Sequence, residues 1–139
     1  MQSYIVSAFI LIFFFMGLGQ FVNEQQMETN RSGFALAIEN AAQHARMEGY
    51  FTPDIKDDML EAIEDQTTIS KSEVRVLELT ETQVCTRQGF SESNQIHYKI
   101  AIPIKNVIIG ASFLGITDAE NMYWYPLQGS VASEKICKG

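Results

Sequence analysis

The residues of this chain that could do chemistry are a group of carboxylates, two histidines and two cysteines. Asp54, Asp57 and Asp58 stand close together, and paired carboxylates can act as general acid and general base. The sequence offers no nucleophile, base or phosphate-binding loop beside them. We interpret them as a solvated helix face near the N-terminus, where acidic side chains complement the helix dipole. The chain is therefore predicted not to be an enzyme, with no catalytic residue.

Cys85 and Cys137 each lie in a segment with the pattern of a β-strand. Two cysteines in one small domain form a structural disulfide where the domain faces an oxidising space. The alternative is a pair of buried free thiols, because a free cysteine packs as a small hydrophobe. There is no CxxC pair, and His44 and His97 give no local chelate with either cysteine, so no metal site and no cofactor are predicted.

The charge balance restricts the partners of the chain. It carries 17 Asp and Glu against 10 Lys and Arg, a formal net charge of -7. Binding of phosphate groups needs a basic stripe, and the cations here are scattered, so we expect no nucleic-acid partner. The same balance disfavours peripheral binding to anionic lipid. Attachment to a membrane would have to depend on apolar residues.

The N-terminal segment supplies those apolar residues. The first 23 residues carry no charged side chain, and residues 4–22 are almost continuously apolar. About 20 such residues cross a bilayer as a helix. A cleaved signal peptide would begin with positive charge and have a shorter apolar core, and a core helix of a soluble domain would show a polar face. We predict a retained membrane helix over residues 1–22, in which Gly17 and Gly19 allow close approach or local unwinding.

Residues 23–49 are predicted to continue this helix outward as an amphipathic segment. Apolar positions recur at steps of three and four residues: Phe34, Ile38, Ala41, Ala42 and Ala45. Gly49 and Pro53 mark the end of the helix. Gly33 weakens the helix by about 1 kcal/mol relative to alanine and marks a candidate bend or melted turn. The small residues on the stripe favour packing against a sheet or against copies of the same helix.

Residues 50–139 read as a globular head. Thr52 is the expected N-cap of a second helix that begins at Pro53 or Asp54 and ends near residue 65. Its apolar face is formed by Ile55, Met59, Leu60 and Ile63. A period of two then indicates strands over residues 73–85, 96–102 and 129–137, the second ended by Pro103. The predicted fold class is α+β: a long N-terminal helix, a short second helix and a small antiparallel sheet.

Two apolar segments of the head keep two interpretations each. Residues 104–116 have no clear period and either cover the sheet or form a surface for a neighbouring molecule. The aromatic triplet at residues 123–125 either fills the core or anchors an interface.

The order of these parts resembles the type IV pilin superfamily. Residues 97–116 (HYKIAIPIKNVIIGASFLGI) and 125–136 (YPLQGSVASEKI) look like the TadE-like pseudopilins of tight-adherence systems, in which a strand ends in a proline, an apolar stretch follows and a closing strand ends in a small-residue and charged phrase. The chain departs from the pilin pattern at Ile5, where pilins usually carry a glutamate that recognises a neighbour's N-terminal amine.

The resemblance implies a subunit that polymerises with copies of itself into an extracellular filament for adhesion, from a membrane-inserted precursor and with pilus assembly machinery as a further partner. The alternative is a membrane-anchored minor pseudopilin or single-pass envelope protein that acts as an assembly or binding module. The residues expected to pack in the filament core are Ile5, Phe9, Ile12, Phe13, Met16 and Phe21.

Overall fold

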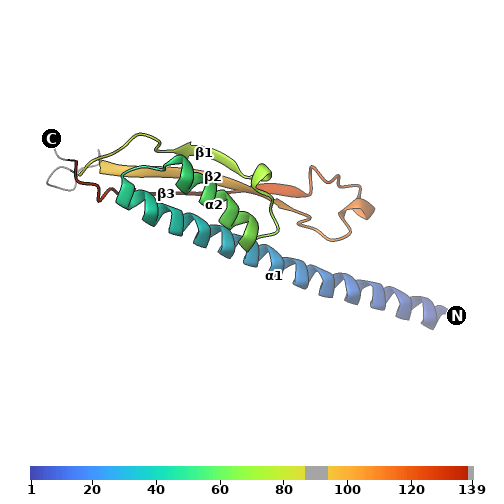
Figure 1. Cartoon of the computed structure of the whole chain (residues 1–139). Helices are drawn as coiled ribbons and strands as arrows, with labels where there is room; N and C mark the ends of the chain where they lie inside the picture. Colours follow the sequence, from blue (N-terminus) through green and yellow to red (C-terminus); the bar gives the residue numbers. More distant parts are fainter. Residues whose placement is uncertain (87–93, 138–139) are drawn as a thin grey trace. The chain divides into compact units, whose positions relative to one another are not determined.

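The computed structural model describes residues 1–86 and 94–137, and it has the predicted α+β layout. Two helices precede an antiparallel sheet with strand order β1-β2-β3 (Figure 1). The elements are α1 (Gln2–Glu48), α2 (Pro53–Gln66), the 3-10 helix η1 (Lys71–Glu73), β1 (Arg75–Leu79), β2 (Gln95–Lys105), the 3-10 helix η3 (Ala111–Leu114) and β3 (Met122–Ala132).

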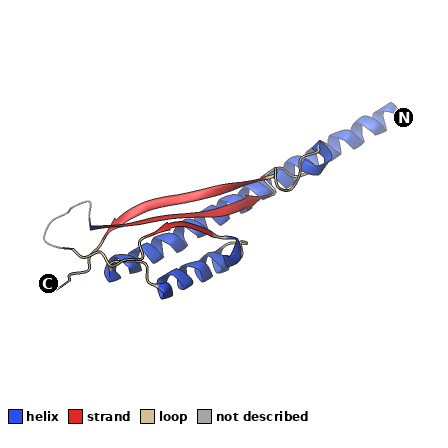
Figure 2. Ribbon diagram, turned by 90° about the horizontal axis from the view of Figure 1, so that it is seen from above, coloured by secondary structure: helices blue, strands red, loops and turns tan. Residues whose placement is uncertain are grey.

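The chain divides into two compact units, each built from distant segments. One unit joins Met1–Thr29 with Ile104–Tyr123, and the other joins Asn30–Pro103 with Trp124–Gly139. The second unit holds the larger core. Within it, the C-terminal half of α1 and the whole of α2 lie beside the strands (Figures 1 and 2).

The predicted stripe on the C-terminal half of α1 is confirmed. The buried residues of α1 are Phe34, Ala37, Ile38, Ala41, Ala42 and Ala45. They share the core of this unit with Phe51, with the apolar face of α2 and with Ile96, Ile100 and Ile102 of β2. Because apolar side chains recur every three or four residues here, one face of the helix can be removed from water along its length.

The start of α2 also follows the sequence prediction. The Thr52 hydroxyl accepts a hydrogen bond from the backbone N–H of Ile55, at 3.2 Å, and Pro53 occupies the first helical position. Ile55, Met59 and Ile63 are buried, whereas Leu60 is only half-buried. This cap satisfies one of the backbone donors that a helix leaves unpaired in its first turn.

Gly33 has a packing role, and the melted turn considered for it does not form. The helix α1 is unbroken from Gln2 to Glu48, through all three of its glycines. A Cβ placed on Gly33 would lie 2.6 Å from the backbone carbonyl oxygen of Gln66, at the end of α2. The glycine is therefore what lets the two helix backbones approach at this point.

Two strand predictions need correction. The strand β2 does not stop before Pro103 but continues to Lys105. Its last residue paired with β1 is Ala101, so Pro103 lies where no β1 residue stands opposite and its missing N–H breaks no bond on that side. The final strand is not over residues 129–137, because residues 122–132 form one continuous strand, β3.

The cysteine segments were also assigned wrongly, since neither Cys85 nor Cys137 lies in a strand. The disulfide itself is present, with the two Cα atoms 5.4 Å apart. The alternative of two free thiols is therefore excluded. The sequence also predicts a turn over residues 89–94, between the first two strands, and residues 89–93 of it lie outside the described residues.

The aromatic triplet takes part in intramolecular packing. Tyr125 meets Phe34 edge to face, with ring centroids 6.2 Å apart. The guanidinium of Arg75 lies over the ring of Trp124, 3.8 Å from its centroid. Each of the three aromatic residues is half-buried. Tyr125 thus joins the core, and the ring of Trp124 on β3 is covered by the cation of Arg75 on β1.

Candidate functional site

The N-terminal half of α1 is the most unusual surface of this molecule. Residues 1–18 are all exposed, and none of the most apolar 18-residue window is buried. Within the described residues α1 is the one helix long and apolar enough to cross a membrane. A soluble helix packed in a core would have most of this window buried, so these side chains need a partner outside the chain.

The residues predicted to pack in a filament core all lie on this helix, with their side chains outward. Ile5, Phe9, Ile12, Phe13 and Phe21 are between 55% and 70% exposed, while Met16 is 40% exposed. Most of them, from Ile5 to Met16, fall on one face because they are spaced by three or four residues. Met16 differs because the chain itself reaches it: a Cβ on Gly110 would lie 3.3 Å from the Met16 methyl carbon.

A loop from the far end of the chain is bonded to this same face. The side-chain amide of Gln20 donates to the carbonyl of Val107, at 2.9 Å, and accepts from the N–H of Ile109, at 3.1 Å. The amide of Asn23 donates to the carbonyl oxygens of Asn106, at 2.6 Å, and of Val107, at 3.4 Å. The side-chain amides of Gln20 and Asn23 therefore pair with backbone groups of the loop, as the backbone of a neighbouring β-strand would. Figure 2 shows the loop over α1.

Asn121 closes the loop on itself. It is buried, its side-chain oxygen accepts from the N–H of Ile108, at 2.8 Å, and its amide donates to the Ile108 carbonyl, at 3.0 Å. Its backbone carbonyl accepts from the N–H of Val107, at 3.3 Å. We name residues 106–116 the docked loop. These bonds hold the docked loop against α1, and its use as a surface for a neighbouring molecule stays a prediction.

The docked loop ends near a carboxylate with a shifted pKa. The backbone N–H and the hydroxyl of Thr117 both donate to one carboxylate oxygen of Glu120, at 2.9 and 2.8 Å. These bonds favour the ionised form, so they lower the pKa of Glu120 below its usual 4.5 although the side chain is fully exposed. The pair forms a local turn, and nothing in its geometry suggests catalysis.

At the other end of α1 the disulfide belongs to a dense junction of three segments. The N–H of Glu134 donates to the Arg46 carbonyl, at 2.8 Å, and the two side chains form an ion pair. The buried hydroxyl of Ser133 donates to the Val84 carbonyl, at 2.6 Å. The C-terminal segment thereby pairs a carbonyl of the last helical turn that would otherwise lack a partner. We read Cys85 and Cys137 as structural.

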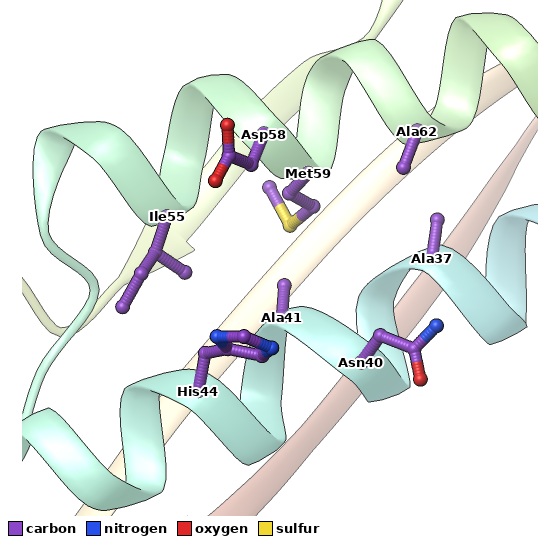
Figure 3. A pocket seen from close by; sticks show the side chains of 8 residues that line it. All are labelled: Ala37, Asn40, Ala41, His44, Ile55, Asp58, Met59 and Ala62. Carbon is purple, nitrogen blue, oxygen red and sulfur yellow. The ribbon is translucent and has the colours of Figure 1, made fainter.

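A shallow groove of about 170 Å³ lies between α1 and α2 in the second unit (Figure 3). His44 and Asn40 line it from α1, and Asp58 and Met59 line it from α2. His44 and Asp58 do not form a hydrogen bond with each other, and within the described chain no group of three or more His, Cys, Asp or Glu side chains could hold a metal ion. The remaining acids on α2 include Asp54 and Asp57, which are exposed. His97 is exposed on β2.

Sequence reasoning missed Gln20, Asn23 and Asn121 as the residues that hold the docked loop. A signal was present for the first of them. Gln20 is the one polar side chain among residues 8–22, and a polar group in such a segment is expensive unless it has a partner. No such signal distinguishes Asn121 from an ordinary turn residue, because its partner backbone is close only in the folded chain.

No family model matches this chain, and no curated protein or solved structure matches it.

Proposed function

We propose that this chain is a pilin-like structural subunit. The N-terminal half of α1 holds it in a membrane before assembly, and copies then polymerise through this helix into an extracellular filament for adhesion or surface attachment. The observation that carries the proposal is the division of α1: residues 1–18 are exposed and apolar, whereas the stripe from Phe34 to Ala45 is packed in the chain's own core.

The two halves of α1 have different physical requirements. Exposure of apolar area to water costs about 25 cal/mol per Å², so the N-terminal half has to be covered by lipid or by protein. Lipid tails satisfy an apolar helix, because all its backbone bonds are internal. A bundle of identical helices satisfies it equally well through close packing. Exchange of lipid for neighbouring helices is therefore the assembly step that we propose.

The docked loop restricts which face of α1 can meet a neighbour. It covers the face of Met16, Gln20 and Asn23. On the opposite face at the same level Phe14, Leu18 and Phe21 remain exposed. Neighbouring helices would then contact the stripe from Ile5 to Phe13, before the loop, and the face of Phe14, Leu18 and Phe21 opposite the loop.

A second candidate is a membrane-anchored minor pseudopilin or envelope protein that does not form the filament body. Two observations favour it. Ile5 supplies no carboxylate for a neighbour's N-terminal amine, and the docked loop occupies part of the helix surface that a densely packed filament core would use. Such a subunit would use its head to bind assembly machinery.

The test is the location of the chain after cells that express it are sheared. A filament subunit is expected in the sheared fraction, in filaments labelled along their length by an antibody to the head. The double substitution F14A and F21A keeps the helix apolar, so we expect it to reduce filaments while the membrane fraction is retained. L77A, at an exposed position of β1, is the matched control and should leave filaments intact. Chain confined to the membrane fraction would support the second candidate.

A further inference from the structure

We propose that the docked loop, residues 106–116, is a second membrane-contacting element that seats Phe113 and Leu114 in the outer part of the bilayer beside α1. This inference rests on the membrane anchoring in the proposed function and goes beyond it, because it assigns lipid contact to a segment of the head. The partner that we propose for the loop is a lipid surface. Contact with a second copy of the chain is the competing outcome.

The first argument is the chemistry of the loop surface. Residues 106–117 contain no charged side chain, while Lys105 stands before them and Asp118 and Glu120 after them. Phe113 is 93% exposed and Leu114 is 70% exposed. The loop therefore exposes large apolar side chains on a short 3-10 helix and carries charges only beyond its two ends. This pattern suits a segment whose middle lies in the acyl region and whose ends lie in water.

The second argument is the pairing of the loop backbone. Non-helical backbone is tolerated near hydrocarbon only where its polar groups are satisfied within the protein. Gln20 and Asn23 pair with the backbone of Asn106, Val107 and Ile109, and Asn121 pairs with both backbone groups of Ile108. The turn after them is bonded internally, from Phe113 to Gly110, Gly115 to Ser112 and Ile116 to Ala111. A water-exposed loop has no need of three side-chain amides for this purpose.

The third argument is the level at which the loop meets the helix. Residues 4–22 form about 28 Å of helix at about 1.5 Å per residue, close to the thickness of a hydrocarbon core of about 30 Å. The loop contacts α1 at Met16, Gly19, Gln20 and Asn23. If residues 4–22 span the core, these contacts lie in its outer third and at its boundary. The apolar tip at Phe113 therefore meets acyl chains and not bulk water.

The test uses tryptophan as a depth probe in the full chain. Trp124, the single tryptophan, is first replaced by phenylalanine to give the W124F background. Into this background F113W, F14W or L77W is introduced, all at exposed positions. Each protein is placed in phosphatidylcholine nanodiscs with ordinary or brominated acyl chains, because bromine quenches only nearby indoles. We expect F14W and F113W to lose most of their emission in brominated lipid and L77W to keep it.

The three probes separate the possible failures. Loss of emission by F14W without loss by F113W overturns the loop inference and leaves the anchor intact. No loss by either F14W or F113W removes the membrane anchor on which both proposals rest. If emission from F113W changes with the number of chains per nanodisc and not with bromination, the loop contacts another copy, which also overturns the inference. Retention of the disulfide and of the circular dichroism spectrum checks that each variant is folded.

Discussion

Gly33 of α1 lies against the backbone carbonyl of Gln66, the last residue of α2, so closely that a Cβ on the glycine would stand 2.6 Å from that oxygen. Nearby, the side chain of Asn30 bonds to Thr68 through both its oxygen and its nitrogen, at 3.2 and 3.0 Å. The two contacts fix the exit of α2 to the start of the packed half of α1. Gly33 is thus a point of close backbone approach between α1 and α2, and the flexibility expected there stays a prediction.

Substitution of Gly33 by alanine should destabilise the folded head. Helix propensity alone would stabilise the chain by about 1 kcal/mol, but overpacking against a backbone atom costs about 1–3 kcal/mol. We expect a net loss of up to about 2 kcal/mol, measured by urea unfolding of the full chain in detergent micelles with Trp124 fluorescence. G17A is the control, because a Cβ there meets nothing within 4 Å. An increase in stability for G33A would contradict the close approach.

Removal of the disulfide should weaken the head more than the substitution of Gly33 does. Cys85 and Cys137 are 52 residues apart, and the loop-closure entropy of such a cross-link is about 4 kcal/mol. C85S/C137S is expected to lower the free energy of unfolding by an amount of this order. Reductant should produce the same loss in the wild type and no further loss in the double variant. Equal stability with and without reductant would mean that the junction around Ser133 alone holds the C-terminus.

Much of the fold could be predicted because its signals are local. The stripe from Phe34 to Ala45 and the cap at Thr52 depend on spacing and on residues within one helical turn, and both were confirmed. Pro103 was read as a strand end because a proline lacks an N–H. Its effect depends on whether a partner strand stands opposite, and that depends on the register with β1, which the sequence does not display.

The docked loop could not be predicted for a similar reason. Gln20 and Val107 are 87 residues apart, and hydrophobic periodicity carries no information about which distant backbone an amide will pair with. The apolar composition of residues 104–116 was visible, but it suits a sheet cover, a subunit interface and a membrane-facing loop equally. The bonds from Gln20 and Asn23 hold the loop against α1, and they exist only in the folded chain.

The carboxyl of Glu120 should titrate below its usual value of 4.5. Because the folded pKa is lowered, the stabilisation it brings is present above the unfolded pKa and is lost as the pH falls through the folded pKa. Carboxyl NMR of the full chain should therefore show a lower titration midpoint for Glu120 in the folded state than in urea. T117V removes the hydroxyl but keeps the backbone donor, so the midpoint should rise only part of the way. A midpoint unaffected by T117V would show that the hydroxyl bond does not form in solution.

Loss of the Gln20 amide should release the docked loop. Q20L preserves the apolar character of the helix but leaves the Val107 carbonyl and the Ile109 N–H without this partner. A hydrogen bond with a net value of about 1 kcal/mol corresponds to about fivefold faster amide exchange at Ile109. Hydrogen exchange of the full chain in micelles measures this directly. Q25L, at an exposed position of the same helix, should leave exchange at Ile109 unchanged.

The docked loop also predicts which face of α1 meets a neighbouring copy. Phe14 is 60% exposed, whereas Met16, two residues further along on another face, is 40% exposed and lies against the loop at Gly110. With a photo-crosslinking residue at either position, assembled chains should form dimers through position 14 far more than through position 16. The matched probe at Leu77 reports contacts made by the head. Stronger dimer formation through position 16 would mean that the loop leaves α1 during assembly, because the same helix surface cannot bind Gly110 and a neighbouring helix at once.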